Sequence, residues 1–215
     1  MDERAQGIVL RYHPFSETSL IVRWLTLNHG RIDTIARGAR RPKSPFRGKL
    51  DLFYLAEFSF ARSRQSELHS LREIRLQNTF TPLRADLSRL RLASYASALI
   101  HQTVEPGPPL PEIFELLHGL LLHLALHPPT PLHLLAFELK LLHALGQEPG
   151  PGELRLSPVV RQIATACQNL QWHQLTPQPS PQIEELNQAL RTFLEFNLGR
   201  LPAQRDSVFT AAPAQ

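Results

Sequence analysis

Positively charged side chains are concentrated in one short segment of the chain, residues 37–49. It contains six cations and no acid: Arg37, Arg40, Arg41, Lys43, Arg47 and Lys49. An arginine presents a planar fork of donors that matches phosphate oxygens, and Gly38 leaves room for backbone N–H groups to approach the same oxygens. The alternative is a solvated loop that serves only solubility, but six cations without one acid favour contact with a nucleic-acid backbone.

Aromatic side chains flank this segment and are candidates for stacking on unpaired bases, as in proteins that hold single strands. They are Tyr12, Phe15, Trp24, Phe46 and Phe53. The alternative for each is a place in the hydrophobic core, and we expect that place for Phe53. For Trp24, which follows Arg23, both interpretations stay open, and we include it among the expected DNA contacts.

Histidines are the next candidates, because imidazole is a common metal ligand. Five lie between residues 118 and 143: His118, His123, His127, His133 and His143. His123 and His127 would face the same side of a helix, but no third ligand follows at a compatible spacing, and a His-Glu-x-x-His motif is missing. We interpret them as partly exposed helical side chains and expect no metal site.

Motifs for catalysis are missing from the sequence. Cys167 lies in the apolar phase of a predicted helix, where a free thiol packs as a small hydrophobe, and the nearby His173 does not by itself make a catalytic pair. A P-loop, a Gly-x-Ser-x-Gly motif and a dinucleotide-binding fingerprint do not occur. The carboxylates Asp33, Asp51 and Glu57 have no evident partner. We therefore expect a protein that is not an enzyme and uses no cofactor.

Length and composition predict a globular protein of one large or two small domains. The chain has 215 residues, of which 42% are hydrophobic and 20% charged. The longest apolar stretch, Leu116–Leu126, is shorter than the roughly 18 residues that cross a bilayer. One cysteine can form neither an internal disulfide nor a multi-cysteine zinc site. Because the first residues lack the features of a signal peptide, we expect a cytoplasmic protein without membrane contact.

The positive charge belongs to the first part of the chain. Residues 1–78 contain 14 Lys or Arg and 8 Asp or Glu, whereas residues 79–215 contain 9 and 11. The two parts therefore carry net charges of +6 and −2. A concentrated basic surface on one part of a protein is typical of proteins that bind polyanions.

Five β-strands are predicted before residue 80, from runs of β-branched and aromatic residues with turn residues between them. Their expected ranges are Gly7–Tyr12, Ser19–Thr26, Arg31–Ala36, Leu52–Phe60 and Leu68–Leu76. The basic segment Arg37–Lys49 contains two glycines and two prolines and is predicted to be an exposed loop. Five short strands favour a small closed barrel, either an OB-fold, which commonly binds oligonucleotides, or an SH3-like barrel.

Helices are predicted after this barrel, because the apolar period lengthens and prolines stand between the periodic segments. The expected ranges are Leu83–Val104, Pro111–His127, Pro131–Leu145, Ser157–Asn169 and Ser180–Leu198, followed by frayed residues 211–215. We therefore expect an α+β protein. An OB-fold domain (residues 1–80) would precede an all-helical domain (residues 81–215).

An ordered series of short motifs over the first 80 residues resembles the RecO family of recombination and DNA-repair proteins. The motifs are Gly7-Ile8-Val9-Leu10, Ser16-Glu17-Thr18-Ser19-Leu20, Gly30-Arg31, Ala36-Arg37-Gly38-Ala39-Arg40 with Ser44, Gly48-x-Leu50-x-x-Phe53, and Leu68-x-x-Leu71. Each motif is weak alone, but their order and spacing together are fairly specific. The helical part agrees with the family only in its architecture.

The resemblance implies an N-terminal OB-fold, a helical C-terminal domain and a role in bacterial recombinational repair. RecO-like proteins bind single- and double-stranded DNA and anneal complementary strands. With RecR they load recombinase onto DNA coated by single-strand-binding protein (SSB), whose acidic C-terminal tail they contact through the helical domain. Some members carry a four-cysteine zinc module, which this chain cannot hold.

The family's basic loop after the third strand matches Arg37, Arg40 and Arg41, and Lys43 and Ser44 extend it. With Arg47, Lys49 and Trp24, these residues are the expected DNA contacts. We expect them to hold the phosphate backbone and leave base edges free to pair, as annealing requires.

Three other functions remain open from the residues alone. An RNA- or ribosome-associated protein built on an OB or SH3-like barrel would carry the same basic loop. A structural adaptor, with the helices as an oligomer scaffold, would bind nucleic acid weakly or not at all. A metal-dependent hydrolase that uses His123 and His127 is the alternative with the least support.

Overall fold

The structure, a computed structural model, describes residues 2–150 and 152–210. These residues form two compact units, which do not follow a single boundary in the sequence. The first unit contains the chain up to Thr81 and the segment Ile100–His118. The second contains Pro82–Leu99 and the chain from Gly119 onward. Helices α1 (Leu87–Thr103) and α2 (Pro111–Leu126) each contribute residues to both units.

The first unit is built around a closed barrel of five strands, in the order β1-β2-β3-β5-β4. The strands are β1 (Asp2–Pro14), β2 (Leu20–Thr26), β3 (Gly30–Ala36), β4 (Leu55–Ala61) and β5 (Leu68–Asn78). All neighbouring strands are antiparallel except β3 and β5, which are parallel. A simple meander would place β4 beside β3. The crossover instead gives a Greek-key barrel, which confirms the expected OB-fold and rules out the SH3-like alternative.

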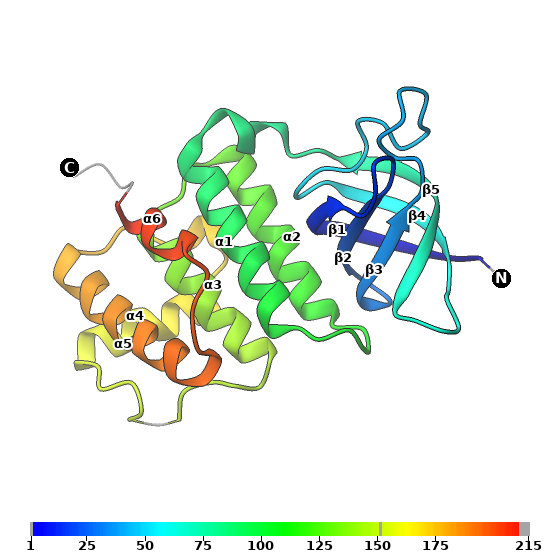
Figure 1. The fold of residues 1–215 in the computed structure, drawn as a ribbon. Helices are drawn as coiled ribbons and strands as arrows, with labels where there is room; N and C mark the ends of the chain where they lie inside the picture. Colours follow the sequence, from blue (N-terminus) through cyan, green and yellow to red (C-terminus); the bar gives the residue numbers. More distant parts are fainter. Residues whose placement is uncertain (1, 151, 211–215) are drawn as a thin grey trace. The chain divides into compact units, whose positions relative to one another are not determined.

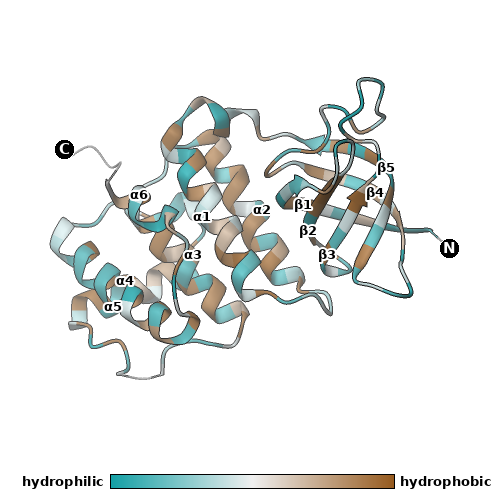
Figure 2. Ribbon diagram, viewed as in Figure 1, coloured by the Kyte–Doolittle hydropathy of each residue, from teal (hydrophilic) through white to brown (hydrophobic). Residues whose placement is uncertain are grey.

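The barrel encloses a hydrophobic core that follows the period-two alternation of its strands. The side chains of Val9, Val22, Trp24, Phe58 and Phe60 are at most 4% exposed and pack together inside it. Trp24 stacks on Phe58, with 4.2 Å between ring centroids. The loop between β3 and β4 extends from one end of the barrel (Figure 1) and is mainly hydrophilic (Figure 2).

Strand β4 begins later than its sequence predicts. We expected a strand from Leu52, but the chain becomes extended only at Leu55, because Phe53 has a left-handed backbone with φ 68°. The amide of Phe53 donates to the carbonyl of Val9 at 2.9 Å, and its ring is 1% exposed, which confirms its predicted place in the core.

Six α-helices follow the barrel in the described part of the chain. They are α1 (Leu87–Thr103), α2 (Pro111–Leu126), α3 (Pro131–Ala144), α4 (Pro158–Asn169), α5 (Ser180–Leu198) and α6 (Gln204–Thr210). Two short 3-10 turns, Thr81–Ala85 and Trp172–Gln174, accompany them. In the second unit, α3 packs against α4, α5 and α6.

The first helix starts four residues later than predicted from its apolar period. The side chain of Asp86 accepts hydrogen bonds from the amide of Ser88 at 2.8 Å and its hydroxyl at 2.6 Å, and so caps the helix. The contact with Ser88 lowers the pKa of Asp86. Residues 81–85 form a separate 3-10 turn before this cap.

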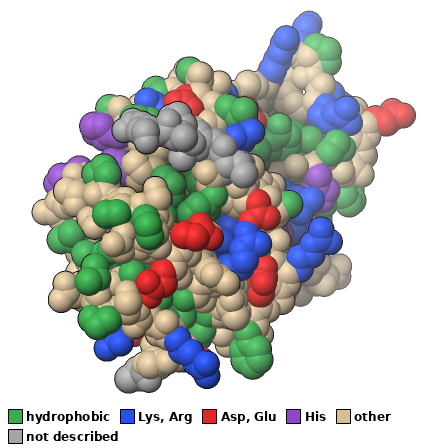
Figure 3. Space-filling model, turned by 90° about the vertical axis from the view of Figure 1, so that its left-hand side faces the viewer, with side chains coloured by type: hydrophobic (Ala, Val, Ile, Leu, Met, Phe, Trp, Pro, Cys, Tyr) green, Lys and Arg blue, Asp and Glu red, His purple; other side chains and the backbone are tan. Residues whose placement is uncertain are grey.

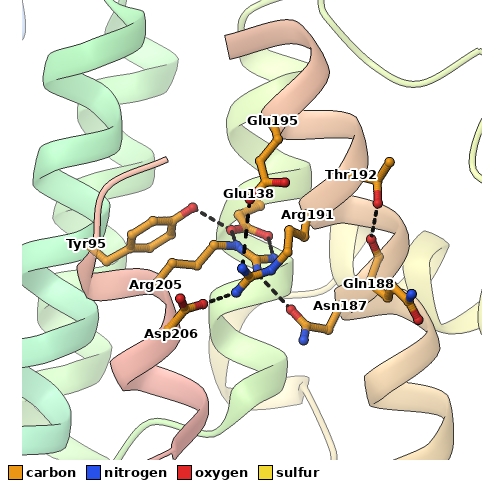
Figure 4. Close-up of polar contacts among 9 residues, drawn as sticks. All are labelled: Tyr95, Glu138, Asn187, Gln188, Arg191, Thr192, Glu195, Arg205 and Asp206. Carbon is orange, nitrogen blue, oxygen red and sulfur yellow. Dashed lines mark hydrogen bonds and ion pairs between the residues drawn. The ribbon is translucent and has the colours of Figure 1, made fainter. Parts of the chain in front are cut away.

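Helix α6 was not predicted, yet it anchors the second unit through a buried arginine (Figure 4). The guanidinium of Arg205 donates to both carboxylate oxygens of Glu138, at 2.7 and 3.0 Å, and to the Asn187 side chain at 2.8 Å. Tyr95 donates its hydroxyl hydrogen to the same carboxylate at 2.5 Å. Burial, with Glu138 beside it, raises the pKa of Tyr95, so this hydroxyl keeps its proton. The network joins α1, α3, α5 and α6.

The surface of the second unit carries charges of both signs. Figure 3 shows basic and acidic side chains next to one another in the middle of the face that it draws. Arg191 pairs with Glu195 and with Asp206, which is one such group of contacts. Among the described residues, the helices are all too short or too polar to span a membrane. The predicted fraying of residues 211–215 concerns residues outside those described.

Candidate nucleic-acid interface

The basic loop, residues 37–50, starts directly where β3 ends at Ala36. It is a series of tight turns: the amide of Arg41 donates to the carbonyl of Gly38 at 3.0 Å, Ser44 to Arg41 at 3.1 Å, Arg47 to Ser44 at 3.2 Å and Lys49 to Phe46 at 3.0 Å. Gly38 has φ 71°, a conformation that side chains rarely adopt. The loop therefore has a defined backbone path.

Apolar side chains of the basic loop anchor it in the barrel. Ala39 is 8% and Phe46 is 6% exposed, and both belong to the core cluster of the barrel. Between these anchors the charged residues turn outward. Lys49 and Ser44 are half-buried. The other five cations of the loop are exposed: Arg37, Arg40, Arg41, Lys43 and Arg47.

The turn between β1 and β2 supports the basic loop from one side. Arg40 donates its backbone amide to the carbonyl of Thr18 at 2.9 Å and its Nη1 to the carbonyl of Ser16 at 3.2 Å. The amide of Gly38 lies 3.5 Å from the hydroxyl of Ser19. These contacts place the Ser16–Leu20 motif beside the Ala36–Arg40 motif.

In the described part of the chain, the cations of the basic loop have no acidic partners. Within residues 2–150 and 152–210, carboxylates pair with Arg23, Arg31, Arg62 and Arg72 of the barrel strands and their connections, but with none of the six cations of the loop. Arg37 donates to the Ser70 hydroxyl at 2.8 Å, and Arg47 to the Pro42 carbonyl at 3.1 Å. The positive charge of this loop is therefore not neutralised within the described chain.

A surface hollow lies within the basic loop. Its apolar lining comes from Leu20, Phe46 and Leu50, and its cationic lining from Arg40, Arg41 and Arg47. An apolar floor beside guanidinium groups suits the sugar and phosphate of a polynucleotide. The hollow brings together three of the residues that the sequence predicts as DNA contacts.

Two other predicted contacts have a structural role. The Ser44 hydroxyl accepts a hydrogen bond from the Phe46 amide at 3.2 Å, so it shapes the turn that anchors the loop. Trp24 is 0% exposed, and its indole Nε1–H donates to the Thr34 hydroxyl at 2.8 Å inside the barrel. The prediction that Trp24 contacts DNA is therefore wrong: the indole is the largest side chain of the barrel core.

Of the aromatic side chains considered for base stacking, two remain accessible to solvent. Phe46 and Phe53 are buried, whereas Tyr12 is 37% and Phe15 is 58% exposed. The Phe15 amide donates to the Ser19 carbonyl at 2.9 Å, which closes the turn that holds Arg40. Phe15 therefore stands next to the basic loop and is the better candidate for base stacking.

Four of the five histidines are in α2 and α3, and His127 directly follows α2. The ring centroids of His123 and His127 are 4.9 Å apart, and those of His123 and His133 are 4.6 Å apart. Burial, with His133 and His127 nearby, lowers the pKa of His123 to about 4. The described residues contain no group of histidine, cysteine and carboxylate side chains arranged to hold a metal ion.

Cys167 is buried in α4, as its apolar phase predicts. Burial raises the pKa of this thiol to about 12, so it is protonated at neutral pH. A thiol in this state is a poor nucleophile.

Comparison with known proteins adds the family to this geometry. The family described as "Recombination protein O N terminal" matches residues 1–80, and "Recombination protein O C terminal" matches residues 84–151. The DNA repair protein RecO of Anaeromyxobacter sp. (strain K) is 32% identical over 235 residues, which cover 93% of this chain and 92% of the relative. The chain belongs to the RecO family.

A second RecO protein, from Bacillus pumilus (strain SAFR-032), is 30% identical over 206 residues, covering 92% of this chain and 79% of the relative. The resemblance found in the motifs is thereby confirmed, and the chain is a RecO-family DNA repair protein. The N-terminal RecO match spans all five strands and the whole basic loop. The C-terminal RecO match ends before α4 begins.

Proposed function

We propose that this chain is a non-enzymatic mediator of DNA repair. It binds single- and double-stranded DNA, anneals complementary strands and helps to load recombinase onto DNA coated by SSB. The proposal rests on membership of the RecO family and on one structural observation: six cations on a loop of defined shape, none of them paired with a carboxylate in the described chain.

The geometry of the basic loop suits annealing. Two strands repel each other through their phosphates, and cations that neutralise phosphates reduce this repulsion. The hollow beside Arg40, Arg41 and Arg47 offers charge and apolar surface but few neutral hydrogen-bonding side chains that would read base edges. The bases of a bound strand then stay free to pair. Covalent chemistry by side chains has no part in this mechanism.

The partners that the family implies are RecR and the tail of SSB. A hollow in the second unit has an apolar lining that includes Leu139, Leu156 and Ala164, and two exposed charged residues line it too. They are Arg161 and Glu148, of which Glu148 pairs with His143. The guanidinium of Arg161 donates to the carbonyl of Leu156 at 3.1 Å, which holds it there. Apolar surface beside a cation is the chemistry that an acidic, hydrophobic peptide tail requires. We propose that the tail of SSB binds at this hollow. We also propose that the protein acts in the cytoplasm, on the nucleoid.

The test is annealing of complementary oligonucleotides that are coated with SSB, with and without this protein. We expect acceleration that declines as salt rises. Acceleration should also decline with Arg161→Glu when SSB is present, but not on bare strands. DNA binding without any acceleration would contradict the mediator function, and a preference for structured RNA would favour the RNA-binding alternative.

A further inference from the structure

A second group of arginines lies on the outer face of β1, β2 and β3, outside the basic loop. Arg11 pairs with Arg23 across β1 and β2, and Arg23 pairs with Asp33 across β2 and β3. Directly paired residues project from the same side of a sheet. Because Trp24 points into the core, the adjacent Arg23 and its two partners point outward.

A β-bulge in β1 brings Arg11 to this face. Val9 pairs with Trp24 and Arg11 pairs with Arg23, so two steps along β1 match one step along β2. Without the extra residue, Arg11 would point the same way as Val9, into the barrel core. The bulge therefore adds a cation to the outer face.

His101 of α1, which belongs to the same unit, lies between two of these arginines. Its Nε2 is 2.5 Å from Nη1 of Arg23, and its Nδ1 is 3.1 Å from Nη1 of Arg31. Burial, with Arg23, Arg31 and Arg11 nearby, lowers the pKa of His101 to about 4, so the ring is neutral at pH 7. A neutral imidazole has one N–H and one bare nitrogen. In either tautomer, one guanidinium therefore faces an N–H donor and lacks an acceptor.

The acids around His101 do not satisfy this group. Asp33 pairs with Arg23 at 3.2 Å, and Glu105 is 3.9 Å from Arg31 with a side chain that is 89% exposed. Arg31 itself is 9% exposed, and its Nε finds no hydrogen-bond partner among the described residues. A buried guanidinium without full pairing is costly, and an oxyanion would supply the missing acceptors.

We infer that Arg11, Arg23, Arg31 and His101 form a second oxyanion site, which takes one phosphate group of a nucleic-acid strand. The site is continuous with the basic loop along the barrel, because Arg23 lies three residues from Leu20, whose strand partner Ala36 precedes the loop. Three residues of strand span about 10 Å. A single strand can therefore contact both places. The inference rests on the proposed DNA binding and extends its path over the β1–β3 face.

The test compares the salt dependence of binding to a short oligothymidylate for four proteins. They are the wild type, Arg11→Gln/Arg23→Gln, Arg40→Ala/Arg41→Ala and the combination of both pairs. Glutamine at residue 23 can still donate to His101, and Arg11 is exposed, so the first pair should fold; thermal unfolding checks this. A fifth protein, Arg62→Gln/Arg72→Gln, removes the same charge from exposed arginines that pair with Glu3 and Asp2, and is the matched control.

Loss of one phosphate contact should lower the slope of log K against log salt by about 0.7 in Arg11→Gln/Arg23→Gln. This change should add to that of the loop pair, because the two places share no partner. An unchanged slope in Arg11→Gln/Arg23→Gln, with a lower slope in the loop pair, would overturn the second site and leave the proposed function intact. Unchanged slopes in both pairs would overturn both.

Discussion

Arg205 and Glu138 form a two-point ion pair in the interior of the second unit, with Nε–Oε1 and Nη2–Oε2 distances of 2.7 and 3.0 Å. Arg205 is 2% exposed and Glu138 is not exposed at all. The pair links the short α6 to α3, beside the surface ion pair that Asp206 of α6 forms with Arg191 of α5. Removal of one partner would leave the other charge buried without compensation.

Arg205→Met should therefore lower the free energy of unfolding by about 3–5 kcal/mol. The control is Arg191→Met, since Arg191 is partly exposed and its ion pairs with Glu195 and Asp206 are at the surface. We expect at most about 1 kcal/mol from this control. Urea unfolding followed by tryptophan fluorescence measures both, and equal effects would show that the buried pair is not needed.

Gly30 is predicted to tolerate no side chain. Its φ is 64°, and a Cβ atom would lie 2.5 Å from the carbonyl oxygens of Gly107 and Pro108. Gly48 has a similar φ of 71° but open space around it. Both alanine variants incur the cost of a left-handed backbone, roughly 1–2 kcal/mol. Gly30→Ala should lose about 1–3 kcal/mol more than Gly48→Ala from the clash. Thermal unfolding of the two variants side by side decides this, and similar losses would refute the close approach.

Stability should fall as the pH is lowered from about 6.5 to about 4. The pKa values of His101 and His123 are about 4 in the folded chain, below the ordinary value, so the unfolded chain binds more protons in this range. Above pH 6.5 both histidines are neutral in the folded and the unfolded chain, and stability is at its full value. Between pH 6.5 and about 4 they protonate mainly in the unfolded chain, which lowers the free energy of unfolding. The measurement is the unfolding free energy of wild type and His123→Phe across this range. The variant should show a smaller slope, and an equal slope would mean that His123 is not buried as described.

Phe15→Ala should weaken binding to single strands by about 1–3 kcal/mol if one base stacks on the ring. The slope against salt should stay unchanged, because no phosphate contact is lost. Trp24 serves as an internal control: its buried indole should show no quenching when DNA binds. A changed salt slope in Phe15→Ala would contradict stacking.

The sequence predicts those parts of the fold that local pattern determines. Strand alternation around Trp24 and Phe58, the loop after Ala36 and the proline-separated helices all follow from residue types. The left-handed backbone of Phe53 could not be predicted in this way, because it accompanies a hydrogen bond to Val9, which is distant in the sequence. Helix α6 could not be predicted either, since seven residues carry little periodicity and Arg205 owes its place to Glu138, 67 positions away.

The candidate site was predictable to a similar degree. Charge alone indicates the basic loop, because Arg40 and Arg41 stand near four other cations without an acid. Whether Trp24 is buried depends on the alternation of side chains along β2. The period-two pattern places Trp24 on the same side as the buried Val22, whereas Arg23 points outward. The group around His101 consists of Arg11, Arg23, Arg31 and His101, which are far apart in the sequence. No local sequence pattern therefore indicates it.

The salt dependence of DNA binding tests the central claim most directly. Single-stranded DNA binding is measured for wild type, Arg40→Ala/Arg41→Ala and the control Arg62→Ala/Arg72→Ala, which removes the same charge from exposed, carboxylate-paired arginines. The loop variant should lose two phosphate contacts and lower the slope of log K against log salt by about 1.4. The control should keep the wild-type slope to within a few tenths. A loop variant with the wild-type slope would contradict the account and place the DNA path elsewhere on the protein.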